Sequence, residues 1–171
     1  MTLQHSTKTT MAIPSHVLTM WSAFSLEQGG IQEERFYEAF GFGDSPALAD
    51  ELGQLVLSGT KRATAGSVWS YESSGKGTPK PGDLSVVTDS NDMPLCIIET
   101  VQVDIVPFSA VSKEFAAVEG EGDGSLAYWR KVHFEYFSRE CASAGRSFNE
   151  DMLLACERFR VVYPPLARST A

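Results

Sequence analysis

The longest stretch of β-type sequence, residues 95–108 (LCIIETVQVDIVPF), constrains the fold more than any other segment. Two sets of side chains alternate along it: Ile98, Thr100, Gln102 and Asp104 in one set, and Glu99, Val101, Val103 and Ile105 in the other. A period of two residues is typical of a β-strand. Shorter runs of strand type occupy residues 63–72, 84–89 and 152–164. The chain therefore has to build a sheet around this long strand.

Helical periodicity surrounds these strands. Val17, Trp21 and Phe24 recur at i, i+4 and i+7, which predicts a helix from Ser15 to Gly29 and Gly30. Further helices are expected over residues 33–40, over 47–57 with Ser45 as N-cap and Pro46 in the first turn, over 109–120 with Ser109 as cap, and over 125–145. The mixed order predicts an α+β fold, either a small twisted sheet or a partly open β-barrel packed by helices, with an N-terminal helical extension.

Length and charge limit the class of protein. A chain of 171 residues fits one domain, expected over 15–165, with flexible tails at 1–14 and 166–171. No apolar run is long enough to span a bilayer, and the N-terminus has no secretory core, so we expect a cytoplasmic protein without a membrane partner. The net charge of −8 argues against binding to duplex DNA. Cys96, Cys141 and Cys156 each lie in apolar segments, which favours buried, reduced thiols.

The segment LSGTKRATAG, residues 57–66, carries the first candidate site. Gly59 stands where a left-handed helix cap belongs, and Lys61, Arg62 and Thr64 follow it. A lysine in a cleft can stabilise charge, and a threonine hydroxyl can act as a nucleophile or a donor. Strict strand alternation puts Lys61 and Thr64 on opposite faces, so they can act together only if Lys61 lies in the turn before the strand. The alternative is a solvated cation at a helix C-terminus.

The segment EGEGDGS, residues 119–125, is the second candidate. Glu119, Glu121 and Asp123 repel one another, and one crowded carboxylate then has a raised pKa suited to acid–base chemistry. The alternative is an acidic turn in which Asp123 or Ser125 caps the next helix. A divalent cation is possible here, but no dedicated metal site is predicted, because no histidine stands at a useful spacing. His133, on the long helix, is interpreted as a partly buried residue with its hydrogen bonds satisfied.

Two aromatic residues follow the cationic segment. Trp69 and Tyr71 stand two residues apart in the run 63–72, so they share one face if this run is a strand. Aromatic faces beside cations can stack a nucleobase. Packing in the core is the alternative, and it suits Trp69 better than Tyr71.

These motifs together resemble the ASCH (activating-signal-cointegrator homology) domain of the PUA-like superfamily. GTKRAT fits the family's G-x-K-x-x-T element, and PKPGD, PLCIIETVQVDIVPF, EFAAVEGEGDGSLAYWRKVH and FNEDMLLACERFRVVY follow in order. The resemblance covers nearly all of the chain from the third helix onward, and it is closest to longer bacterial members with N-terminal helices. It implies a small PUA-type barrel, with a cleft between barrel and helices, and an association with RNA.

The resemblance also implies chemistry. Some members look like ribonucleases, and shorter ones resemble amidohydrolases that deacylate N4-acetylcytidine with the lysine and threonine of G-x-K-x-x-T and a glutamate. Lys61 and Thr64 match, and Glu121 is the first choice for the glutamate, with Glu119 second because the loop is longer here. We predict a catalytic set of Lys61, Thr64 and Glu121, with Arg62, Trp69, Tyr71, Glu119, Asp123 and Ser125 binding substrate. Binding and hydrolysis of single-stranded RNA is ranked first, deacylation of a modified nucleoside second, and a binding module without turnover third.

Overall fold

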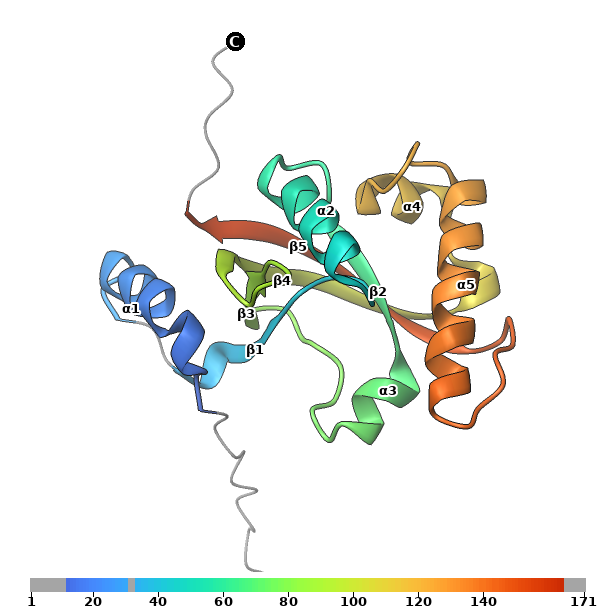
Figure 1. The fold of residues 1–171 in the computed structure, drawn as a ribbon, viewed down its shortest axis with the longest axis horizontal. Coiled ribbons are helices and arrows are strands. Elements are labelled where there is room, and N and C mark those ends of the chain that lie inside the picture. The colour runs from blue at the N-terminus through green and yellow to red at the C-terminus, as the bar shows by residue number, and fades with distance from the viewer. Residues whose placement is uncertain (1–11, 31–32, 165–171) are drawn as a thin grey trace, which may run out of the picture.

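The computed structural model of the chain describes residues 12–30 and 33–164 (Figure 1). In chain order its elements are α1 (Leu18–Glu27), β1 (Phe36–Phe40), α2 (Pro46–Leu57), β2 (Ala63–Ser67), α3 (Val68–Ser73), β3 (Leu84–Thr88), β4 (Pro94–Pro107), α4 (Lys113–Glu119), α5 (Leu126–Ser143) and β5 (Leu153–Tyr163). Single 3₁₀ turns lie at Ser15–Val17, Glu33–Arg35 and Phe108–Ala110.

The strands form one mixed sheet in the order β1-β3-β4-β5-β2. β1 runs parallel to β3, and the other neighbouring pairs are antiparallel. β1 and β2 lie at opposite edges and do not pair with each other, so the sheet is an unclosed one. The predicted α+β class, with a partly open rather than closed sheet, is confirmed.

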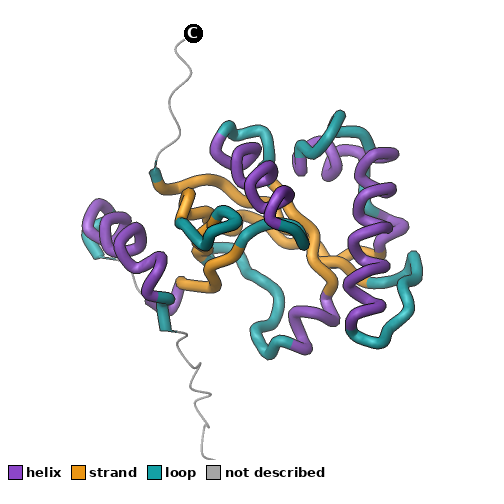
Figure 2. Tube along the Cα trace, viewed as in Figure 1, coloured by secondary structure: helices purple, strands orange, loops and turns teal. Residues whose placement is uncertain are grey.

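Helices cover both faces of the central strands (Figure 2). Val86 and Ile97 pack with Trp21 of α1 on one side, whereas Val87 and Ile98 pack with α2 on the other. A third apolar cluster joins α4 and α5 to β2 and β5 around Trp129 and Phe137. Burial on both faces explains why all of β3 is apolar or small, without the alternation of a half-exposed strand. Beyond Thr100 the long strand loses this cover, and Val101 and Ile105 are exposed.

Three local predictions were wrong. Residues 33–40 form a 3₁₀ turn followed by β1, not a helix, because Phe36 pairs with Leu84 of β3 and packs against Trp21. The strand at 63–72 ends at Ser67, where pairing with β5 stops and α3 begins. The cap of α4 is Ser112, whose hydroxyl accepts from the Phe115 N–H at 3.1 Å, and not Ser109.

Other local predictions were confirmed. Ser45 caps α2 with Pro46 in its first turn, and β2 begins at Ala63, so Lys61 lies in the turn before the strand. The three cysteines are buried free thiols. The predicted tails fall mostly outside the described residues, which leave out 1–11 and 165–171. Within the described ranges, no helix combines the length and apolarity needed to cross a bilayer.

Candidate active site

Lys61 is held by the end of α2. The Gly59 N–H donates to Val56 O and the Thr60 N–H to Leu55 O, the paired bonds of a Schellman cap with Gly59 at φ +78°. The Lys61 N–H also bonds Leu55 O, so the backbone turns sharply away from the helix axis. The predicted glycine cap therefore fixes where the lysine side chain starts.

The acidic loop lies directly against this turn. α4 ends at Glu119 and is capped by Gly120, whose backbone is left-handed at φ +67°. A β-carbon at position 120 would overlap the carbonyl of Thr60, so a glycine is needed for this close approach. The Arg62 N–H bonds Val118 O, which fixes the approach from the other side. Two segments far apart in the sequence thus meet backbone to backbone.

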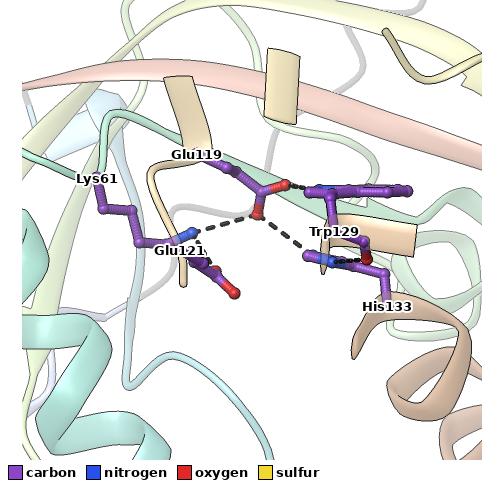
Figure 3. A network of polar contacts seen from close by, with 5 residues as sticks. All are labelled: Lys61, Glu119, Glu121, Trp129 and His133. Atoms are coloured by element: carbon purple, nitrogen blue, oxygen red, sulfur yellow. Dashed lines mark hydrogen bonds and ion pairs between the residues drawn. The ribbon is translucent and has the colours of Figure 1, made fainter. Parts of the chain in front are cut away.

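A buried network of charges forms where they meet (Figure 3). Lys61 Nζ lies 2.7 Å from Glu121 Oε1 and 3.2 Å from Glu119 Oε1, and the lysine side chain is only 1% exposed. Glu119 also accepts from the Trp129 indole N–H, and His133 Nε2 lies 3.4 Å from Glu119 Oε1. Both candidate glutamates contact Lys61 and line a cavity; the side chain of Glu119 is 1% exposed and that of Glu121 is 15% exposed.

The partners of Glu119 decide its charge. Burial opposes ionisation, but Lys61, His133 and the Trp129 N–H together hold the pKa of Glu119 down at about 2. Burial likewise opposes the charge on His133, yet Glu119 and then Glu121 raise the pKa of this imidazole. Glu119 is therefore ionised at neutral pH and lies between the amine of Lys61 and the ring of His133.

His133 is the member of the network that sequence reasoning missed as a functional residue. Its ring stacks on Trp129 with centroids 4.1 Å apart, and its Nδ1 donates to Trp129 O at 2.9 Å, which turns Nε2 toward Glu119. The available signal was its spacing of four residues from Trp129, which puts both on one face of α5.

This histidine also bears on the metal question. Glu119, Glu121 and His133 each offer an atom within 4.8 Å of the others, which is a set that can hold a cation. The prediction that no histidine is available was therefore wrong. The ammonium of Lys61 already bonds both carboxylates, so a metal ion would have to displace it.

A cavity of about 460 Å³ opens beside the network, between the sheet, α2, α3 and α5. Seven glutamates are among the described residues that line it: Glu38, Glu51, Glu119, Glu121, Glu135, Glu140 and Glu157. The basic side chains of the lining are His133 and Arg139, and Arg139 is bonded to Asp44 at 2.8 Å. Carboxyl groups therefore outnumber basic side chains in the lining, and Lys61 and His133 offset the charge of Glu119 and Glu121.

The remaining predicted residues divide between the cavity and its surroundings. Thr64 and Tyr71 line it, and burial raises the pKa of the Tyr71 phenol. Arg62 is exposed outside it, and Asp123 accepts from the Ser125 N–H. Ser125 caps α5. Trp69 lies on α3 under the guanidinium of Arg146, 4.6 Å from the ring centre, so the predicted strand face shared with Tyr71 does not exist.

Comparison with known proteins decides the family. The family model described as the ASCH domain matches residues 38–163, which is most of the chain. This chain belongs to the ASCH domain family. The resemblance seen in the motifs is thereby confirmed.

Solved structures agree with this assignment. The ASCH domain from Lactobacillus crispatus JV V101 has a TM-score of 0.79 at 34% identity, over 88% of this chain and 96% of that one. Protein EF3133 from Enterococcus faecalis V583 also has a TM-score of 0.79, at 36% identity, over 86% of this chain and 88% of that one. A search of curated proteins gives no match. The ASCH domain is in general associated with nucleic acids or nucleotides, which supports that broad class of ligand.

Proposed function

We propose that this ASCH protein is an amidohydrolase that removes an acyl group from the exocyclic amine of a nucleoside, of the N4-acetylcytidine type. The observation that carries the proposal is the acidic cavity with a threonine hydroxyl in its wall. Its volume of about 460 Å³ lies in the range of small-molecule sites. A nucleoside carries no phosphate, so seven glutamates do not repel it.

The polar groups of the cavity suit an amine-bearing base. Carboxylates accept hydrogen bonds from the N4 amine of cytosine, and Glu121 lies at the cavity wall with its other contacts made to Lys61. Lys61 is too buried to touch a substrate and acts as a positioning residue that holds Glu119 and Glu121. Thr64 is the nucleophile: its Oγ1 attacks the acyl carbon, and water later releases the acid from the threonine ester.

The test measures release of cytidine and acetate from N4-acetylcytidine by chromatography. We expect turnover by the wild-type protein and a fall on the order of 10³-fold in Thr64→Ala, as for other nucleophiles that are removed. Thr60→Ala is the matched control, because Thr60 is exposed outside the cavity and its hydroxyl contacts only Ser58 among the described residues. No turnover by the wild-type protein would end the proposal.

Hydrolysis of single-stranded RNA, which we predicted first from the sequence motifs, is the second candidate function. The acidic lining argues against a phosphate backbone inside the cavity, because each phosphate would face several carboxylates. A single-stranded RNA can still place one base in the cavity while its phosphates remain outside, which agrees with the family's general association with RNA. Labelled RNA and N4-acetylcytidine, each incubated with the wild-type protein, distinguish the two: cleavage of the RNA with N4-acetylcytidine left intact would favour the ribonuclease.

The third possibility is a module that binds a modified base without turnover. Binding of N4-acetylcytidine that is unchanged in Thr64→Ala, with no product from either protein, would favour it. Loss of turnover with retained binding in Thr64→Ala would instead support the amidohydrolase.

A further inference from the structure

Glu157 lies directly opposite Thr64 in the sheet, although the motifs gave it no role. β2 and β5 pair antiparallel, and the register matches Thr64 with Glu157. Side chains of directly opposed residues lie on the same face, with β-carbons about 4.5 to 5.5 Å apart. Both residues line the cavity, which agrees with this placement. A hydroxyl and a carboxyl group are thus neighbours in one wall.

The surroundings of Glu157 leave one of its oxygens for a ligand. The residue is 6% exposed, and the Thr100 hydroxyl lies 2.6 Å from its Oε1. Thr100 comes from β4, so the carboxyl group is oriented by a neighbouring strand of the rigid sheet. With Oε1 occupied, Oε2 is the oxygen that can exchange a proton in the cavity.

We infer that Glu157 is a further catalytic residue, which takes the proton of the Thr64 hydroxyl and passes it to the leaving amine. The inference rests on the proposed role of Thr64 as a nucleophile. Lys61 cannot fill this place, because its amine is buried and bonded to two carboxylates. The carboxylate oxygens of Glu119 are likewise occupied by contacts with Lys61, His133 and Trp129.

The charges around Glu157 suit a proton carrier near neutral pH. Burial raises the pKa of Glu157 to about 7; the Thr100 hydrogen bond opposes the shift, Glu38 and Asp83 add to it, and Lys61 opposes it weakly. The phenols of Tyr37 and Tyr71 also face this carboxyl group, and it contributes to raising their pKa values. At neutral pH both forms of Glu157 are therefore populated, as acid–base catalysis requires.

Glu157 can accept and return every proton that the reaction transfers. As Thr64 Oγ1 bonds to the acyl carbon, its proton goes to the Glu157 carboxylate. That proton then goes to the amine nitrogen as the C–N bond breaks, which leaves an ester on Thr64. Water attacks the ester and gives its proton to Glu157, which returns it to Oγ1 as the C–O bond breaks. The net reaction is amide plus water to amine plus acid.

The test uses p-nitrophenyl acetate, which probes Thr64 without a nucleoside. Acetylation of Thr64 is followed by mass spectrometry between pH 5.5 and 8.5. We expect the wild-type rate to rise with an inflection near pH 7 and then level off, because Glu157 must be ionised to accept the proton. Glu157→Gln, which keeps an oxygen for the Thr100 hydroxyl, should be on the order of 10²-fold slower and lose the inflection.

Two variants control for structure. Glu114→Gln makes the same chemical change at an exposed position of α4 and should behave as wild type. Thr100→Val keeps Glu157 but removes the hydrogen bond that lowers its pKa, so the inflection should move to higher pH. If Glu157 were only structural, the pH of the inflection would not depend on Thr100. Thr100→Val therefore tests the inference even if Glu157→Gln does not fold.

The outcomes separate this inference from the proposed function. Glu157-dependent acetylation of Thr64, with N4-acetylcytidine left intact, supports the Glu157 role and rejects only the substrate. An unlabelled Thr64 in the wild-type protein overturns the Glu157 role. So does a Glu157→Gln rate within threefold of wild type, or an inflection that stays in place in Thr100→Val.

Discussion

Glu119 and Glu157 are two buried glutamates of the same cavity, and their environments have opposite effects. They are 1% and 6% exposed, so burial penalises the charge of both. Lys61 and His133 contact Glu119, and its pKa falls to about 2. Glu157 has a neutral hydroxyl as its hydrogen-bond partner and the carboxylates Glu38 and Asp83 nearby, and its pKa rises to about 7. Burial raises the pKa of both, so the placement of cations decides which of the two glutamates is ionised at neutral pH.

The difference between the two pKa values suits Glu119 to a structural role in this cavity and Glu157 to proton transfer. A permanently charged Glu119 can hold Lys61, His133 and Trp129 in fixed positions but is a poor proton carrier. Glu157 can carry a proton at neutral pH, and it forms no ion pair with the residues that the structure describes. Their pH dependences also have opposite signs. The stability that Glu119 provides is lost as pH falls from about 4.5 toward 2, whereas the ionisation of Glu157 lowers stability as pH rises through about 7.

Removal of the cation from the Glu119 side should have the largest effect on stability. Lys61→Met keeps the length of the side chain but leaves Glu119 and Glu121 without the ammonium, which should cost about 3 to 5 kcal/mol of unfolding free energy at pH 7. Urea unfolding measures this. Lys113→Met, at an exposed lysine of α4, should change stability by less than about 0.5 kcal/mol. A loss below about 1 kcal/mol in Lys61→Met would contradict the importance of the buried pair.

On the Glu157 side, substitution should change the pH dependence more than the stability at low pH. The folded pKa of about 7 lies above the ordinary 4.5, so the folded state keeps a proton that the unfolded state releases between these values. Wild type should therefore lose about 3 kcal/mol relative to Glu157→Gln between pH 4.5 and pH 8. Unfolding by urea at both pH values measures the difference. A gap between the two proteins that is constant with pH would mean that Glu157 ionises normally.

The contrast between the two glutamates also marks what the sequence could predict. Gly59 is a local signal, so the position of Lys61 in the turn before β2 was predictable. The loop bearing Glu119 and Glu121 carried enough local charge to be noticed. The pairing of Thr64 with Glu157 depends on the register of β2 against β5, which no local pattern contains.

The failed predictions have the same origin. Residues 33–40 have aromatic residues at helical spacing, but pairing with β3 made the last five a strand. Trp69 and Tyr71 are of residue types that favour strands. The pairing of β2 with β5 nevertheless ends at Ser67 and Leu154, before either residue is reached. Local helical or strand preference was overridden wherever sheet pairing began or ended.

The smallest expected effect concerns Glu121, and it sharpens the division within the network. Its side chain is 15% exposed, and Lys61 keeps Glu119 when Glu121 loses its charge. Glu121→Gln should therefore cost about 1 kcal/mol at pH 7, well below the loss in Lys61→Met. Glu135→Gln removes an exposed partner of Lys131 on α5 and serves as control, with a change below about 0.5 kcal/mol. If Glu121→Gln costs as much as Lys61→Met in urea unfolding, Glu121 and not Glu119 is the anion that stabilises the buried lysine.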